Sequence, residues 1–483
     1  MITDIKTMKA NVLHIIILAI FSLTLTCCNK AIDDNAVYAE DDASPVKSVR
    51  TPYIFQPVPL ESVNGIVTVE ENNEMPSTDT QHYNLVIINS KGEKKTVPFA
   101  LDWDVSVVYD DDKIDDEIRA SIDYTIDYCL SGVTINGNTR GITLRTNSSD
   151  EIYVEILGEE NDKYFVMFYN GIIKFDKEGN LLLKKLQMTI DFTFSVDVPA
   201  LSAPLDDGGY VLLYKRQEGR HDEDDEYDEY DEYDEYDEYD EDANLPYDGV
   251  TLRYYDGQGR FSRQYTVESY SKDALFYHLV KVGANFFLVH DKSIAVLSQE
   301  GRLIKDIKFE EEFVHCFSYA EDFYFSSFLS SEEKYSLLKY DSNGDLKLQH
   351  VFQPKTNSAV LLNATTYHGQ TLLSGYNLSN FVWLLHSNSF GTESNYDGLL
   401  LTISGNSEAT ENCLDSDNGL VLYAVIEKPD GSCTLYYDKL GISYGWQTHI
   451  YVYNIDKIED LFRANSPAET ENDSNAETDD YDY

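Results

Sequence analysis

Carboxylates are the most numerous side chains in this sequence that could do chemistry. The 483 residues include 86 Asp and Glu, and the formal net charge is −49. Neighbouring acids such as residues 110–112 and 310–312 could act as acid and base on a glycosidic bond if the fold held two of them at hydrolase distance. In so acidic a chain, adjacent acids also arise by chance, and a solvated face is the simpler interpretation. We therefore assign no catalytic residue.

Other reactive patterns are weak. The ten histidines do not form an HExxH motif, and no G-x-S-x-G elbow occurs. The segment from Asp341 to Asp345, DSNGD, opens like an oxygen-rich calcium loop, but its glycine and distal glutamate are not where an EF-hand requires them. We interpret it as a hairpin turn. No cofactor and no fixed metal site are expected, apart from weak, diffuse Ca²⁺ binding by the acidic insertion described below.

Aromatic side chains are the other candidates for ligand binding. The chain has 37 Tyr, 22 Phe and 3 Trp. Most tyrosines alternate with other residues inside strand-like runs, which predicts packing in the core. An exposed aromatic ring can stack on a sugar, and Trp383 and Trp446 are the two residues we put forward for that role.

The N-terminus has the features of an export signal. Lys6 and Lys9 precede an apolar stretch, residues 12–25, that is too short for a membrane-spanning helix. The stretch ends in Leu25-Thr26-Cys27-Cys28, which resembles a bacterial lipobox. The resemblance implies that residues 1–28 are a lipoprotein signal peptide and that Cys28, or alternatively Cys27, receives the lipid. An ordinary signal peptide with incidental cysteines is the other interpretation.

Residues that follow the cysteines bear on location. Asp33 and Asp34, close behind Cys28, resemble the surface-export signal of Bacteroides-type lipoproteins. The resemblance implies an outer-membrane lipoprotein, either exposed at the surface or facing the periplasm. The charge of −49 excludes nucleic acid as a partner, because binding phosphates requires a basic surface. The expected partners are the membrane, through the lipid anchor, and an envelope protein or a glycan.

A repeated turn organises the rest of the chain. Strand-like runs flank FDKEG, YDGQG, LSQEG, YDSNG and YDKLG, and the final glycine of each can supply the positive φ of a short hairpin. Gly259, Gly301 and Gly344 are spaced by 42 and 43 residues, the length of a four-stranded propeller blade. Stacked blades bury both faces of each sheet, and closing the ring protects the sheet edges.

The sequence therefore predicts an all-β fold, with a β-propeller of about six blades over residues 143–460. With strands lettered a to d within a blade, the c–d turns are expected at glycines 179, 259, 301, 344, 405 and 441. DGGYVLLY (207–214) resembles the entry to strand b in many bacterial repeat propellers, although no subfamily signature is present.

The region before residue 143 is less regular. We expect a flexible linker over residues 29–60 and a small β-sandwich-like domain over 61–142, because LDWDVSV (101–107) resembles a strand of Bacteroides-type Ig-like modules. Gly92 and Gly137 repeat the blade spacing, so extra blades, giving seven or eight in all, are the alternative.

Two acidic segments interrupt or follow the propeller. Gly179 and Gly259 are about twice the blade spacing apart, and the excess, residues 217–248, contains DEYDEYDEYDEYDEY. From Asp222 to Asp242 there are sixteen acids, five tyrosines and no basic residue, so we expect a disordered insertion in a b–c hairpin. Residues 387–397 form a second b–c excess on the same face, and 461–483 an acidic disordered tail.

Four cysteines follow the lipobox pair, and they do not form a CxxC metal ribbon. A disulfide between Cys413 and Cys433 requires neighbouring strands, and buried thiols are the favoured interpretation. The other two are Cys129 and Cys316.

The function we expect is that of a lipid-anchored envelope β-propeller that acts as a non-enzymatic binding or scaffold module for an envelope protein or glycan. The alternative is a glycan-degrading enzyme, a hydrolase or a lyase, with carboxylates at the propeller funnel.

Overall fold

The structure is a computed structural model of the chain. All described residues belong to one compact unit, Val46–Tyr483. In them the chain forms β-strands and one short 3-10 turn, η1 (Glu61–Val63), with no α-helix. No helix in this part is long and apolar enough to span a membrane. The structure describes residues 47–51, 56–72, 81–108, 139–161, 165–193, 197–217, 247–267, 275–329, 334–352, 358–367, 370–386, 389–404, 408–414, 421–438 and 448–456.

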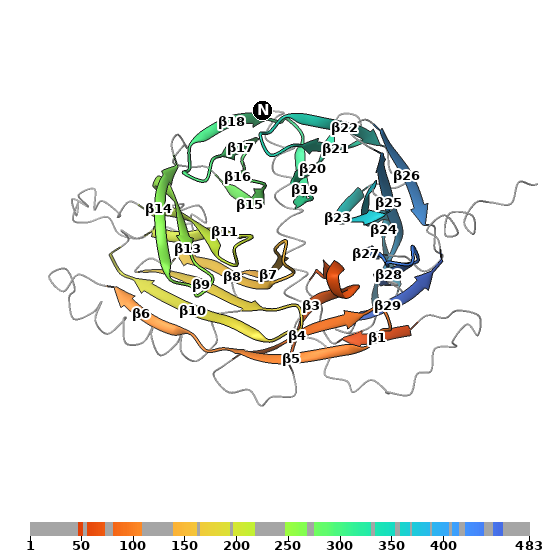
Figure 1. Cartoon of the computed structure of the whole chain (residues 1–483), viewed down its shortest axis with the longest axis horizontal. Helices are drawn as coiled ribbons and strands as arrows, with labels where there is room; N and C mark the ends of the chain where they lie inside the picture. The colour runs from red at the N-terminus through yellow and green to blue at the C-terminus, as the bar shows by residue number, and fades with distance from the viewer. Residues whose placement is uncertain are drawn as a thin grey trace, which may run out of the picture. The chain divides into compact units, whose positions relative to one another are not determined.

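The described strands form seven sheets, which we number in the order in which they follow one another around a ring (Figure 1). Sheet 1 contains β2 (Val58–Leu60), β3 (Gly65–Glu71), β4 (Gln81–Asn89) and β5 (Lys94–Leu101). Sheet 2 contains β7 (Thr139–Thr146), β8 (Ile152–Asn161), β9 (Val166–Phe175) and β10 (Leu181–Asp191), with β6 (Asp104–Val108) at its edge. Sheet 3 contains β11 (Asp197–Pro204), β12 (Tyr210–Gln217), β13 (Tyr247–Tyr255) and β14 (Phe261–Val267).

The remaining sheets repeat the same antiparallel order. Sheet 4 contains β15 (Phe276–Val282), β16 (Asn285–His290), β17 (Ser293–Leu297) and β18 (Leu303–Lys308). Sheet 5 contains β19 (Glu312–Tyr319), β20 (Asp322–Leu329), β21 (Lys334–Tyr340) and β22 (Leu346–Phe352). Sheet 6 contains β23 (Ser358–Tyr367), β24 (Gln370–His386), β25 (Ser389–Ser404) and β26 (Glu408–Leu414). Sheet 7 contains β27 (Val421–Glu427), β28 (Cys433–Asp438) and β29 (Thr448–Ile455), and its outermost strand is β1 (Lys47–Thr51).

An apolar cluster fills each interface between consecutive sheets. For example, Val211 and Leu213 of sheet 3 pack with Phe286 and Leu288 of sheet 4, and further clusters join each of the other neighbouring pairs, including sheet 7 to sheet 1. Both faces of every sheet are therefore covered, which is the arrangement of a β-propeller. The prediction of an all-β propeller is confirmed: sheets 2 to 7 are the six blades expected after residue 143, and sheet 1 is one more sheet in the same ring.

The N-terminal region differs from its first expectation. Residues 58–101 do not form a separate β-sandwich: Ile87 of sheet 1 packs on sheet 2, and Ile88 packs on sheet 7. The alternative of a further blade describes this region. LDWDVSV is not one strand: Leu101 ends β5, and Asp104 begins β6, which pairs in parallel with β10 and extends sheet 2. An isolated four-stranded sheet leaves apolar faces exposed, and insertion between two blades removes both from water.

Ring closure uses part of the segment that we expected to be a linker. β1 pairs antiparallel with β29, with Lys47 opposite Val452 and Thr51 opposite Thr448. It supplies the fourth strand of sheet 7. Gly441 is outside the described residues, but in the chain it falls between strands b and c of that sheet, so one of the six predicted c–d turns was wrong. Backbone pairing between residues about 400 positions apart holds the N-terminal strand to the C-terminal sheet, and no local pattern reveals it.

The c–d glycines adopt the predicted conformation where they are described. Gly179, Gly259, Gly301 and Gly344 have φ between 71° and 78°. At the last of these turns the Gly344 N–H donates to the Asp341 carbonyl over 2.9 Å, and Asp341 Oδ1 accepts the N–H groups of Asn343 and Asp345 at 3.0 Å each. The interpretation of DSNGD as a hairpin turn is confirmed, because its first carboxylate is used by its own backbone.

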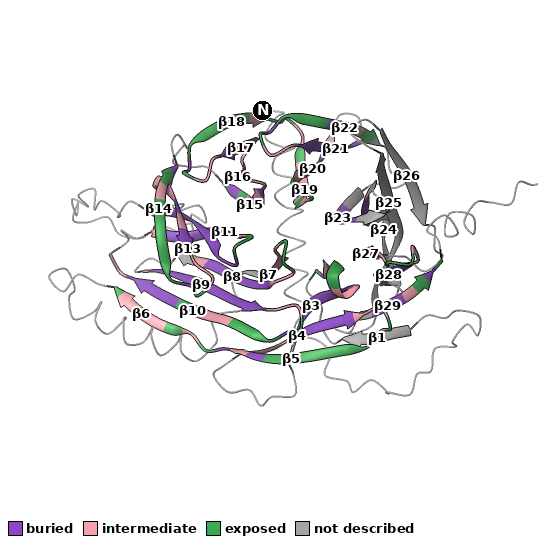
Figure 2. Ribbon diagram, in the orientation of Figure 1, coloured by how far each residue is buried: buried purple, intermediate pink, exposed green. Residues whose placement is uncertain are grey.

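These turns also connect neighbouring sheets. A lysine on the outer strand of one sheet donates to a carbonyl in the c–d turn of the next: Lys185 to Gly259 over 2.9 Å, and Lys305 to Gly344 over 2.8 Å. Lys95 makes the equivalent bond to Glu178. Figure 2 shows that the outer strands β14 and β18 are largely exposed, whereas β9 and β17 are almost wholly buried.

The long acidic segment lies where the sequence places it. Gln217 of β12 pairs with Tyr247 of β13, so the insertion belongs to a b–c hairpin; residues 218–246 lie outside the described part, as does the tail beyond residue 456. The second predicted b–c excess, 387–397, also lies in a b–c hairpin, that of β24 and β25, with residues 387–388 outside the described part. Residues 389–397 continue β25 and pair with β24 as far as His386, because backbone pairing can extend a hairpin through polar residues.

We predict that Gly344→Ala lowers the free energy of unfolding by about 2–4 kcal/mol. The alanine would keep an unfavourable φ of 77°, and its Cβ would lie 2.7 Å from Val296 Cγ2 in the preceding sheet. Gly249→Ala is the matched control, since a Cβ there meets no heavy atom within 4 Å. Urea unfolding followed by circular dichroism measures both. Equal stabilities for the two variants would contradict the role of this turn.

Candidate functional site

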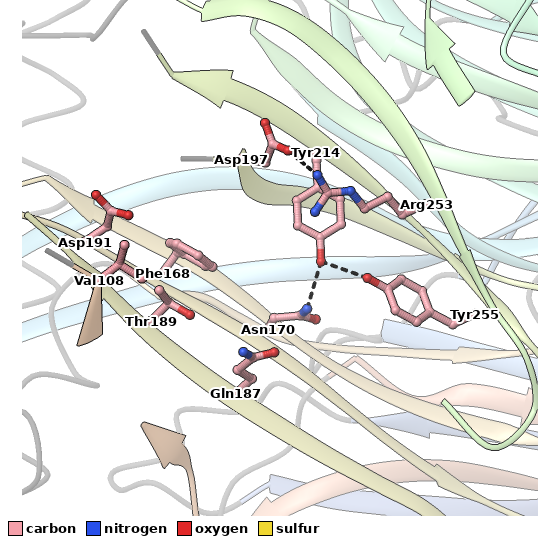
Figure 3. A pocket seen from close by; sticks show the side chains of 10 residues that line it. All are labelled: Val108, Phe168, Asn170, Gln187, Thr189, Asp191, Asp197, Tyr214, Arg253 and Tyr255. Carbon is pink, nitrogen blue, oxygen red and sulfur yellow. Dashed lines mark hydrogen bonds and ion pairs between the residues drawn. The ribbon is translucent and has the colours of Figure 1, made fainter. Parts of the chain in front are cut away.

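A polar hollow of about 560 Å³ lies between sheets 2 and 3 (Figure 3). Its volume is within the range of small-molecule clefts. One wall comes from β9, β10 and the end of β6, and the other from β11, β12 and β13. The lining residues are Val108, Phe168, Asn170, Gln187, Thr189, Asp191, Asp197, Tyr214, Arg253 and Tyr255.

The wall from sheet 2 follows the two-residue period of a strand. Phe168 and Asn170 are two residues apart on β9, and Gln187 and Thr189 are two residues apart on β10. All four side chains therefore project from the same face of sheet 2. Gln187 lies opposite Asn170 in the sheet register, which places two amide side chains next to each other. Gln187 is exposed, and no hydrogen bond joins its amide to another described residue. This wall thus offers hydrogen-bond donors and acceptors beside the aromatic ring of Phe168.

The facing wall carries two tyrosines joined to the first wall. Asn170 Nδ2 donates to Tyr214 Oη over 3.0 Å, and the hydroxyls of Tyr214 and Tyr255 are 3.2 Å apart. Burial and the neighbouring Tyr255 raise the pKa of Tyr214 far above its ordinary value, so its hydroxyl is neutral at physiological pH. Whichever tyrosine donates to the other, the second phenolic proton has no acceptor among the described residues.

Arg253 is held rigidly beside these tyrosines. Its guanidinium carbon lies 4.1 Å from the centroid of the Tyr214 ring, and Nη2 pairs with the carboxylate of Asp197. Nε is buried without a hydrogen-bond partner in the described part of the chain. Stacking and ion pairing together fix the plane of the guanidinium, which lowers the entropy lost when a ligand binds to it.

The second carboxylate of the hollow is also fixed. Asp191 is buried at the end of β10, and its Oδ1 accepts both the N–H and the hydroxyl of Thr193 at 2.7 Å. The hollow therefore contains two carboxylates and one guanidinium. A ligand with net negative charge would gain little there, whereas a neutral ligand that both donates and accepts hydrogen bonds would match the lining.

The ring faces of the two tyrosines in the hollow are mostly covered by other side chains, so stacking on a sugar is not their main contribution to ligand binding. The Tyr255 ring is stacked on Tyr210 with centroids 4.9 Å apart, and Lys185 Nζ lies 5.0 Å from its centroid. Arg253 covers a face of Tyr214. The aromatic residues are thus used for internal packing, and their hydroxyl groups are what they present to the hollow.

A second polar cluster ties several sheets together near the inner strands. Arg145 Nη1 donates to the carbonyls of Ser202, over 3.0 Å, and Leu279, over 2.7 Å, and Nε lies 3.3 Å from Glu155 Oε2. One guanidinium thereby joins sheets 2, 3 and 4. Removal from water raises the pKa of Glu155. Burial and the charge of Arg145 lower the pKa of His315, in sheet 5, to about 4.

The turn η1 makes a further link across the ring. Tyr319 of sheet 5 donates its hydroxyl to Glu61 Oε1 over 3.0 Å, and the Ser62 N–H donates to Asp150 Oδ2 of sheet 2 over 3.0 Å. η1 lies inside the ring (Figure 1). It joins sheet 1 to a sheet that is not its neighbour.

Most of the residues put forward from the sequence lie outside the described part of the chain. Trp383 belongs to β24, with its side chain outside the described part, and Trp446, Cys27 and Cys28 lie wholly outside it. Residues 110–112 are likewise not described, and 310–312 are not among the lining residues. Cys413 and Cys433 lie in β26 and β28, which belong to different sheets.

Sequence reasoning missed every residue of the hollow. One signal was present: Asn170 interrupts the otherwise apolar VMFYNGII of β9, and Arg253 stands between Leu252 and Tyr254 in β13. A polar residue at a core-facing position indicates a specific partner. Only the packing of sheet 2 on sheet 3 shows that these two positions face each other.

Comparison with known proteins gives distant structural likenesses. No protein-family model matches the sequence, and no curated protein matches it. A Bacteroides caccae protein of unknown function is similar over 57% of this chain and 93% of its own, with 9% identity and a TM-score of 0.27. The AfRom2 CNH domain is similar over 83% of this chain and 95% of its own, with 8% identity and a TM-score of 0.33. The Neurospora crassa Pan2 WD40 domain is similar over 65% of this chain and 89% of its own, with 9% identity and a TM-score of 0.27. At these values they carry no information on function.

We predict that His315 makes stability depend on pH. Its pKa falls from an ordinary 6.5 to about 4 on folding, so the unfolded chain binds the proton first. The stabilisation is present above pH 6.5 and is lost as pH falls towards 4, by up to about 3 kcal/mol. Glu155, whose pKa is raised, acts in the opposite direction, so the difference between wild type and His315→Gln is the quantity to measure by urea unfolding from pH 4 to 7. Parallel curves would refute the assignment.

Proposed function

We propose that this protein is a lipid-anchored β-propeller of the bacterial cell envelope that binds a ligand without transforming it. The observation that carries the proposal is the polar hollow between sheets 2 and 3, whose side chains are preorganised by one another. Asn170 and Tyr214 fix each other, and Asp197 and Tyr214 fix Arg253. Groups already held in place bind a ligand with little entropic cost.

The envelope location is supported by the sequence. The basic and apolar residues before Leu25-Thr26-Cys27-Cys28 form a lipoprotein-type signal, and the acids behind Cys28 resemble a surface-export signal. A glycan or an envelope protein is the kind of ligand available there. A propeller supports this use because its rigid ring holds loops and clefts at fixed positions.

A glycan-degrading enzyme is the second candidate, favoured by the presence of Asp191 and Asp197 in one hollow. Both carboxylates already accept hydrogen bonds, from Thr193 and from Arg253. A glycosidase needs one carboxyl held protonated as the general acid. Glu155, whose pKa burial raises, is held by Arg145 and does not line the hollow. Binding therefore has the stronger support.

We predict that the full-length protein is retained on an immobilised bacterial or plant polysaccharide without releasing products from it. The measurement combines retention with assays for reducing ends and for unsaturated uronate products. Retention with no product supports a binding module. Product release that disappears in Asp191→Asn or Asp197→Asn would establish the enzyme instead.

We predict further that Cys28→Ala combined with Cys27→Ala moves the protein from the membrane fraction to the soluble fraction, because a lipid chain on one of these cysteines is the expected anchor. Fractionation of cells that express the wild type, each single variant and the double variant shows which cysteine carries it. Membrane retention of the double variant would reject lipid anchoring.

A further inference from the structure

We propose that the polar hollow between sheets 2 and 3 is a binding site for a small neutral saccharide, held by hydrogen bonds from amide, phenol and guanidinium groups. This assignment rests on the proposed binding function and gives it a site and a ligand class. It concerns side chains that no sequence motif singles out.

The two walls supply opposite halves of a hydrogen-bonding surface. On sheet 2, Gln187 presents an amide with both a donor and an acceptor, and Asn170 has its carbonyl oxygen left after its NH₂ group donates to Tyr214. On sheet 3, the pair Tyr214 and Tyr255 keeps one unshared proton. A sugar hydroxyl is a donor and an acceptor at once, so one hydroxyl can accept from the phenol while it donates to an amide oxygen.

Arg253 and Asp197 add a charged pair at the same wall. Asp197 is the one hydrogen-bond acceptor that the described residues give Arg253, although a guanidinium has five N–H groups. A planar guanidinium beside a carboxylate can engage two adjacent hydroxyls of a pyranose, one as acceptor and one as donor. Figure 3 shows the pair on one side of the hollow, with Thr189 and Phe168 on the opposite side.

Charge selects among saccharides. Asp191 and Asp197 outnumber Arg253 among the charged groups of the lining, and the whole chain is strongly acidic at −49. A uronic acid or a phosphorylated sugar would bring a negative charge towards these two carboxylates, whereas a neutral sugar pays no such cost. The volume of about 560 Å³ admits a small saccharide and excludes a folded protein partner.

The test titrates the full-length protein with methyl glycosides of neutral hexoses and pentoses by isothermal titration calorimetry, with galacturonate as the anionic probe. Wild type is expected to bind at least one neutral glycoside and to bind galacturonate more weakly. Gln187→Ala and Tyr255→Phe should each weaken binding about three- to ten-fold, the usual effect of losing one hydrogen bond. Gln349→Ala, which removes an exposed glutamine from the outer strand β22 of sheet 5, is the matched control and should bind as wild type does.

A further variant, Gln187→Trp, separates loss of binding from loss of folding. Gln187 is exposed, so a larger side chain there narrows the hollow without entering the core. The expected result is loss of binding with an unchanged melting temperature. Normal binding by this variant would place the ligand elsewhere.

The outcomes separate this site from the proposed function. Saccharide binding that Gln187→Ala and Tyr255→Phe leave intact overturns the site but keeps the binding function. Tighter binding of galacturonate than of any neutral glycoside overturns the ligand class. Failure of every glycoside, together with retention on a polysaccharide, rejects the small-saccharide assignment while the polysaccharide-binding function stands.

Discussion

Covering both faces of every sheet is the constraint on which this structure depends. A single four-stranded sheet of this chain would expose apolar residues on two sides, and only stacking against a sheet on each side removes them from water. The clusters between consecutive sheets, from Ile87 against sheet 2 to Ile88 against sheet 7, show that the requirement is met around the ring. β1 completes sheet 7, so the two ends of the described chain depend on each other.

The glycine-containing c–d turns set the spacing between neighbouring sheets. At Gly259 and Gly344 the backbone has a positive φ, so a side chain would be strained at both positions. A Cβ would clash with Val296 Cγ2, at 2.7 Å, at Gly344, and would make a tight contact with Leu183 Cδ1, at 3.2 Å, at Gly259. Lys185 and Lys305 bind the carbonyls of these same glycines. Each turn thereby fixes both its own hairpin and the distance to its neighbour, which explains why the turn motif persists while the strands between vary.

The polar hollow is an exception to this close packing. An apolar cluster fills part of the interface between sheets 2 and 3 as well. At the hollow, however, polar groups stand beside that cluster, among them Asn170, Tyr214 and Arg253. Hydrogen bonds, stacking and an ion pair offset the cost of burying these groups. Apolar residues at these positions would stabilise the ring more. The polar lining therefore points to ligand binding, whereas the apolar clusters stabilise the fold.

The sequence alone determined the strands of most blades, four of the turn glycines, the blade length and the position of the acidic insertion, because each depends on neighbours within one hairpin. The period of the apolar residues and the Gly259, Gly301 and Gly344 spacing are local and can be read directly. The tertiary structure decided three things: that residues 58–101 join the ring, that β1 closes sheet 7, and that Asn170 faces Tyr214. Each of these is a contact between segments far apart in the chain, and its strength depends on how two complete sheets pack, which no single segment encodes.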